Sequence, residues 1–171
     1  MLNDVLRNTA RFLILMLLQV LIVKNIELGK FVNPFIYILF LMMLPFTIPN
    51  GLLLIIAFVT GLTMDMFYNT MGMHAFACVF MAYCRPSVLR IISPRDGYEF
   101  GAEPTLRSMG LQWFLPYSIV LVLIHHTVLF TVEFFRFSEF GSTFLKIIFS
   151  SIATIILLFI SQFLFYKEKQ K

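Results

Sequence analysis

Long apolar stretches separated by short polar connectors run through the whole chain. Within each stretch the apolar residues are continuous and do not alternate with polar ones. A continuous apolar run of roughly 20 residues is typical of a helix that crosses a membrane, whereas a membrane barrel requires alternation. The pattern therefore predicts an all-α polytopic membrane protein, with residues 1–171 as a single transmembrane domain. The six predicted transmembrane helices are residues 9–24, 34–48, 51–68, 73–90, 111–135 and 143–166.

The second and third predicted helices are shorter than the roughly 20 residues that a crossing helix needs. Pro34 suits the first turn of the second helix, and Pro45 is expected to kink or end it. Pro49, Asn50 and Gly51 follow closely and predict a tight turn. The third helix is therefore expected to begin directly after the second.

The composition agrees with a membrane location. Hydrophobic residues make up 60% of the chain and charged residues 13%, against about 45–50% and about 25% in soluble domains. A core of this size cannot cover so much apolar surface, so membrane lipid is expected to cover it. The formal net charge is +4, but the basic residues flank apolar runs, as in membrane proteins, and we expect no nucleic-acid binding.

Lys and Arg are distributed unevenly between the two sides of the predicted bundle. The side that carries both termini, the second connector and the fourth connector has nine of the thirteen, counting Arg85, and the other side has four. Membrane proteins retain their Lys- and Arg-rich loops in the cytoplasm. The distribution therefore predicts that both termini and the loop 91–110 are cytoplasmic.

Small and polar residues form a stripe along the predicted third helix, because they recur at every fourth position. The members of the stripe are Ala57, Gly61, Asp65 and Asn69. Such stripes pack against another helix in lipid. We predict that the stripe, together with Gly72 and His74 of the following hairpin, binds a partner or a neighbouring helix. Asp65 is open to two interpretations, a ligand for protons or substrate, or a polar contact that fixes the hairpin.

The adjacent His125 and His126 lie in the middle of the predicted fifth helix. Neighbouring residues point about 100° apart on a helix, so the pair is poorly placed to bind one metal ion. We expect buried neutral histidines, with a contact between Asp65 and one of them as a further hypothesis. The chain contains no HExxH, GxSxG or phosphate-binding glycine motif. The sequence therefore predicts no enzyme activity and no metal or other cofactor.

The only long hydrophilic stretch lies within the loop 91–110 and combines charges of both signs with aromatic residues. It is either a solvated connector or a cytoplasmic docking site for another protein. The candidate docking residues are Arg95, Asp96, Tyr98 and Glu99.

Several segments together resemble the family of the rod shape-determining protein MreD, in the form found in Bacteroidota. They are residues 33–37 (NPFIY), 44–46 (LPF), 61–90, 94–99 (PRDGYE) and 124–126 (IHH). The similarity extends over nearly the whole chain, and its specific parts are the block 61–90 and the loop 94–99.

This resemblance implies a non-catalytic scaffold subunit of the bacterial cell-elongation complex, in the bacterial inner membrane. The family binds the single-span protein MreC. It works with the filament protein MreB, with RodA and with the elongation transpeptidase in peptidoglycan synthesis and cell-shape maintenance. The family fold is similar to that of the substrate-binding S-component of energy-coupling-factor (ECF) transporters.

That fold similarity supplies an alternative function, the substrate-binding subunit of an ECF-type vitamin transporter. Such subunits typically carry an Ala-x-x-x-Ala coupling face on the first helix. Here Ala10 is followed four residues later by Ile14. The missing coupling face disfavours the transporter.

Overall fold

The secondary structure of the described residues is entirely helical, with loops and extended segments between the helices. A computed structural model describes all residues except 1, 27, 100, 135–139 and 165–171. The elements are α1 (Leu2–Leu21), η1 (Val23–Asn25), α2 (Ile38–Met42), α3 (Asn50–Tyr68), α4 (Met73–Ile91), α5 (Leu106–Met109), α6 (Leu111–Phe134) and α7 (Phe140–Leu164).

Four segments in the described ranges are long and apolar enough to cross a membrane. They are Val5–Asn25, Asn50–Tyr68, Leu111–Glu133 and Gly141–Leu164. Helix α4 has the same length as α3 but carries His74, Arg85 and Arg90, which lower its hydropathy. The polar residues of α4 are largely inside the fold, since His74 and Arg85 are both buried.

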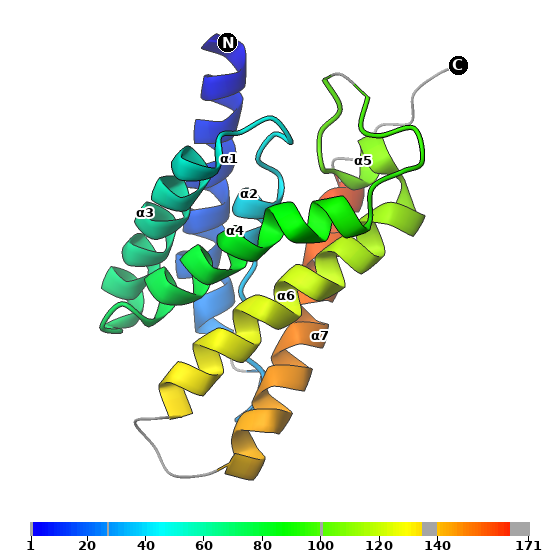
Figure 1. The fold of residues 1–171 in the computed structure, drawn as a ribbon. Helices are drawn as coiled ribbons and strands as arrows, with labels where there is room; N and C mark the ends of the chain where they lie inside the picture. Colours follow the sequence, from blue (N-terminus) through cyan, green and yellow to red (C-terminus); the bar gives the residue numbers. More distant parts are fainter. Residues whose placement is uncertain (1, 27, 100, 135–139, 165–171) are drawn as a thin grey trace.

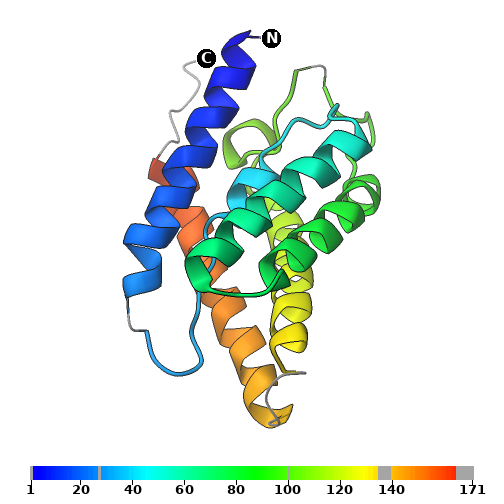
Figure 2. The ribbon, with the colours of Figure 1, turned by 90° about the vertical axis from the view of Figure 1, so that its left-hand side faces the viewer.

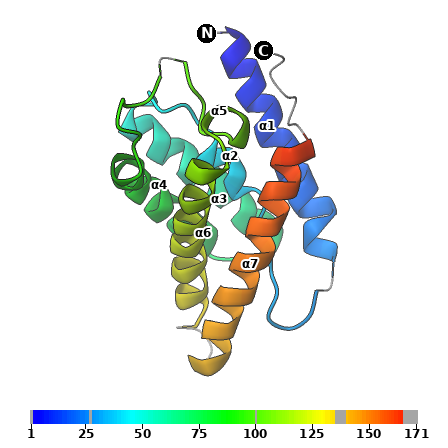
Figure 3. The same cartoon turned by 90° about the vertical axis from the view of Figure 1, so that its right-hand side faces the viewer.

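The helices form a chain of neighbours around a buried centre. Helix α3 packs on α4, α4 on α6 and α6 on α7, and Figure 1 shows α4 lying obliquely between α3 and α6. Helix α1 lies at the edge of the bundle and contacts the short α2. Figures 2 and 3 show it beside α7. The start of α1 and the end of α7 lie at the same end of the molecule, which we call the basic end (Figure 1).

The predicted second helix, residues 34–48, is wrong as a continuous helix, because only Ile38–Met42 is α-helical. In the extended residues before it, the backbone amides donate to side chains of other helices and not to backbone carbonyls. The Phe35 amide donates to the Thr154 hydroxyl (3.0 Å) and the Ile36 amide to Gln19 Oε1 (2.8 Å). Residues 35–44 are all buried. Non-helical backbone is tolerated at membrane depth only where protein groups satisfy it, and α1 and α7 supply those groups.

Candidate functional site

Helices α3 and α4 approach each other closely where they cross. A β-carbon at Gly61 would lie 2.6 Å from the Ala75 nitrogen and would collide with the His74 carbonyl oxygen. Ala57, one turn earlier on the same face, is fully buried. Small residues let membrane helices approach until their backbones touch. Gly61 is therefore the residue that sets the α3–α4 distance.

The Asp65 carboxylate caps the first turn of α4. Its Oδ1 accepts hydrogen bonds from the His74 amide (3.0 Å) and the Thr70 hydroxyl, and its Oδ2 accepts one from the Ala75 amide (2.9 Å). The first amides of a helix lack partners within the helix, and a negative charge beside them is favourable. Asp65 thus fixes the α3–α4 hairpin, in line with the second of its two interpretations.

Of the two predicted binding partners of the small-residue stripe, the structure shows a neighbouring helix, α4, for the buried members of the stripe. These are Ala57, Gly61, Asp65 and His74. They are covered because α3 and α4 pack against each other through this face. Asn69 (φ 54°) and Gly72 (φ 79°) adopt left-handed conformations in the turn between the helices, so they reverse the chain direction.

A single hydroxyl group joins two histidines in the centre of the fold. Tyr37 Oη lies 3.0 Å from His74 Nδ1 and 2.8 Å from His125 Nε2, with Cys78 Sγ at 3.5 Å. All four side chains are buried. His125 Nδ1 has no hydrogen-bond partner in the described residues, so placing the proton on Nε2 leaves no buried N–H unpaired. His125 then donates to Tyr37, and Tyr37 donates to His74.

His126 belongs to a separate set of contacts. Its Nδ1 donates to the Val122 carbonyl (2.9 Å), and its Nε2 lies 3.1 Å from the Thr154 hydroxyl. That hydroxyl also accepts the Phe35 amide. The hypothesis of a contact between Asp65 and His125 or His126 is wrong, because each histidine has other partners. None of the described residues form a His, Cys, Asp and Glu group that could hold a metal ion.

Arg85 is a functional candidate that the sequence analysis missed. It is 1% exposed, and its guanidinium donates to the Tyr117 hydroxyl (2.8 Å) and to the Met42 (3.3 Å) and Leu44 carbonyls. The arginine thereby caps the C-terminal end of α2, where carbonyls lack helical partners. Counting Arg85 as a loop residue was wrong. Without it the two sides of the bundle still differ, by eight basic residues to four.

The predicted docking residues of the loop fall into two groups. Arg95, Asp96 and Glu99 are exposed. Tyr98 stacks on Phe46 with ring centroids 4.2 Å apart, and its hydroxyl donates to the Leu89 carbonyl (2.6 Å). Partial burial raises the pKa of Tyr98 above its usual value. Tyr98 therefore anchors the loop, and only the three charged residues remain available to another protein.

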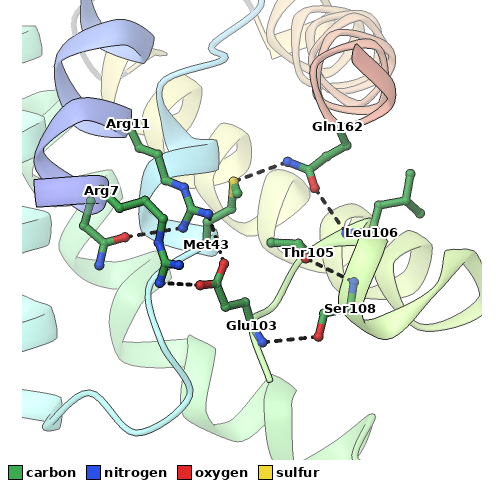
Figure 4. A network of polar contacts seen from close by, with 9 residues as sticks. Arg7, Arg11, Met43, Glu103, Thr105, Leu106, Ser108 and Gln162 are labelled. Atoms are coloured by element: carbon green, nitrogen blue, oxygen red, sulfur yellow. Dashed lines mark hydrogen bonds and ion pairs between the residues drawn. The ribbon is translucent and has the colours of Figure 1, made fainter. Parts of the chain in front are cut away.

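A second polar network at the basic end was not predicted (Figure 4). Glu103 accepts ion pairs from Arg7 (2.5 Å) and Arg11 (2.9 Å), which ties the loop to α1. Gln162 of α7 accepts the Leu106 amide (3.1 Å) and so ties α5 to α7. The paired residues are far apart in the sequence, 92 positions for Arg11 and Glu103 and 56 for Leu106 and Gln162, and no local pattern indicates such pairs.

At the end opposite the basic end, a cavity of about 310 Å³ opens beside the histidine cluster. Its lining includes His74 and Tyr68 together with Lys24, Glu133 and Lys146. Lys24 donates to the Phe67 carbonyl (2.6 Å), and Lys146 pairs with Glu133 (2.8 Å). The cavity can thus present ring and charged groups to a small polar molecule.

No known protein family, curated protein or solved structure matches this chain in the three comparisons that were made. The MreD-type family and the S-component fold therefore stay predictions that depend on the residues quoted above.

Proposed function

We propose that this chain is a non-catalytic scaffold subunit of the bacterial cell-elongation complex, which binds MreC in the inner membrane. It crosses the membrane six times, and both termini face the cytoplasm. The mixed segment 34–48 makes the second crossing, in the interior of the bundle. The basic end then lies on the cytoplasmic side, where the excess of Lys and Arg favours it.

The way the interior polar groups are used supports a scaffold. Asp65 caps a helix, Arg85 caps another, and Tyr37 joins His74 to His125. Each of these costly buried groups contributes to holding elements together. Hydrogen bonds between buried polar groups hold the elements that carry them in one arrangement, and a rigid core is what a scaffold needs to present a fixed surface.

One exposed tyrosine carries the proposal that a partner helix binds α4. In the described residues, four other tyrosines have hydroxyl partners within the chain: Tyr37, Tyr68, Tyr98 and Tyr117. Tyr83, near the middle of α4, is 70% exposed and has no such partner in the same ranges. A phenol that faces hydrocarbon lacks water to bond with, so a group from another helix is its natural acceptor.

Two phenylalanines extend this surface along α4. Phe76 and Phe80 are 55% and 43% exposed, and with Tyr83 they are spaced by four and three residues. Residues at this spacing lie on one face of a helix. We infer that this aromatic face, Phe76, Phe80 and Tyr83, packs against the membrane helix of MreC.

The test is copurification of MreC with the tagged chain from native membranes in a mild detergent. We expect Phe76→Ala with Tyr83→Leu to reduce bound MreC at least about tenfold, because aromatic anchors at interface centres contribute about 2 kcal/mol or more. Phe144→Ala is the matched control, since Phe144 is 63% exposed on α7, away from the aromatic face. Unchanged MreC recovery with the double variant would contradict the proposed interface, and absence of MreC from the wild-type preparation would contradict the function.

The exposed charges of the loop provide a separate proposed contact, with MreB, RodA or the elongation transpeptidase. Replacing Arg95, Asp96 and Glu99 together by Ala leaves the anchor Tyr98 in place. We expect this variant to fold normally and to recover less of these proteins, while MreC recovery is unchanged. Equal recovery of all partners would assign the loop to a simple connector.

The cavity beside His74 favours the second candidate function, a substrate-binding subunit of an ECF-type vitamin transporter. Its volume of about 310 Å³ is at the lower end of the range of small-molecule sites, about 300–1,000 Å³. In the proton arrangement given above, His74 Nε2 carries a proton and can donate to a ligand. A thermal-shift screen with vitamins discriminates, because a bound ligand stabilises the fold by mass action. Strong stabilisation that His74→Gln abolishes would favour the transporter over the scaffold.

A further inference from the structure

The basic end contains a cavity of about 490 Å³ between α1, α5 and α7. Three arginines line it, Arg7, Arg11 and Arg107, and among the described residues Glu103 is the only acidic one in its lining. Glu103 pairs with Arg7 and Arg11. Arg107 is exposed and has no hydrogen-bond or ion-pair partner in the described part of the chain. The wall therefore carries excess positive charge, which fits an anion.

A groove between α1 and α7 continues from this cavity. It has a volume of about 510 Å³, and it shares Ile14, Leu15 and Ser161 with the cavity. Nearly all of its lining is aliphatic, from Ile14 to Ile26 on one side and from Ala153 to Leu164 on the other. Figure 3 shows α1 and α7 next to each other on this side of the molecule.

The dimensions of the groove match one leaflet of a bilayer. Ala153 to Leu164 spans about 16 Å at a rise of about 1.5 Å per residue. One leaflet contributes half of a hydrocarbon core that is about 30 Å thick, or about 15 Å. The groove is therefore about as long as the acyl chains of one leaflet are deep. The arginines of the adjoining cavity lie at the basic end, where the lipid headgroup would lie.

We propose that the cavity and the groove together bind one anionic phospholipid. The phosphate lies among Arg7, Arg11 and Arg107, and an acyl chain fills the groove between α1 and α7. The charge at one end argues for a lipid over a partner helix, because an apolar helix would leave the arginines at the mouth without an anion. The lipid also adds contacts between α1 and α7, which pack little against each other in the described residues. This proposal does not depend on the proposed function.

The test uses the full chain purified in mild detergent and partly delipidated. Dioleoyl phosphatidylglycerol or dioleoyl phosphatidylcholine is then added, and bound lipid is counted by native mass spectrometry. We expect one phosphatidylglycerol per chain to be retained in preference to phosphatidylcholine. Arg11→Gln and Arg107→Gln should each weaken retention about fivefold, since one basic residue contributes about 1 kcal/mol near an anionic surface. Arg95→Gln, an exposed arginine outside the cavity, is the matched control.

A second pair of variants tests the groove itself. Ala153→Phe fills the groove, whereas Ile152→Phe places the same side chain on the neighbouring, 50% exposed position outside its lining. We expect only Ala153→Phe to release the phospholipid. Equal retention of both lipids, or equal losses with Arg95→Gln and Arg107→Gln, would overturn the proposal. So would Ala153→Phe if it released MreC and left the lipid bound, because a partner helix would then occupy the groove.

Discussion

Two pairs of helices in this molecule meet in opposite ways. Helices α3 and α4 approach until Gly61 lies against the backbone of His74 and Ala75, and Asp65 joins the end of one to the start of the other. Helices α1 and α7 instead face each other across a groove of about 510 Å³. Small residues close a contact between helices, and large aliphatic residues flanked by arginines leave it open. We therefore expect the α3–α4 pair to determine stability and the α1–α7 pair to determine what the protein binds.

Filling the α3–α4 contact should have the largest effect. Overpacking typically costs about 1–3 kcal/mol, and we expect Gly61→Leu to lie at the upper end of this range, because it would force the two backbones apart. We expect little monodisperse protein in size-exclusion chromatography, and early thermal unfolding of what remains.

Gly51→Leu is the matched control for this variant, because a β-carbon at Gly51 meets no atom within 4 Å. It makes the same substitution in the same helix, and we expect it to behave like the wild type. Equal stability of the two variants would show that the α3–α4 approach does not limit stability.

Removing the cap of α2 should have the next largest effect. Arg85→Met retains much of the buried volume but leaves the Leu44 carbonyl without its donor. A buried polar group without a partner costs about 1–3 kcal/mol, so we expect a loss of about 2 kcal/mol in the free energy of unfolding. Arg85→Lys retains one donor and should lose less. Higher stability of Arg85→Met than of Arg85→Lys in a thermal-unfolding assay would contradict the capping role.

Weakening the cap of α4 should have a smaller effect. Asp65→Asn retains one acceptor oxygen but loses the negative charge and the second acceptor, which bind the His74 and Ala75 amides and Thr70. Losses at helix N-termini are typically about 1 kcal/mol. Thermal unfolding measures this loss, and Thr63→Val serves as a control, because the Thr63 hydroxyl donates within its own helix, to the Val59 carbonyl. A stability equal to that of the wild type would mean that Asp65 is not needed to fix the hairpin.

Helix positions were predictable where apolar runs end at residues that break helices. The predicted 51–68 and 73–90 differ by one residue from Asn50–Tyr68 and Met73–Ile91. The turn between them contains Asn69 and Gly72, which adopt the left-handed conformations that such residues favour. The residues that end these helices lie within the turn itself, so the local sequence pattern is sufficient to predict where the helices end.

The segment 34–48 could not be predicted, because its backbone partners lie far away in the sequence. Its extended part depends on Gln19 and Thr154. An apolar run has the same composition whether it forms a helix in lipid or an irregular segment inside a protein. The same limit applies to the site: the stripe around Gly61 predicts a close contact and left open a partner protein or the next helix, and the structure shows the next helix, α4.

We expect the smallest effect on stability from a change on the α1–α7 side. This change also gives the sharpest test of the contrast between the two helix pairs. Glu103→Gln breaks two partly exposed ion pairs, to Arg7 and Arg11. Such pairs contribute about 0–1 kcal/mol, so thermal unfolding should change little. The same substitution removes a negative charge from the lining of the basic cavity, where Glu103 is the one acidic side chain that the described residues contribute. Retention of phosphatidylglycerol should therefore rise although stability falls slightly, and the rise should fade at high salt, where exposed charges are screened. If lipid retention falls together with stability, the α1–α7 side contributes to stability as the α3–α4 side does, and the contrast between the two pairs does not hold.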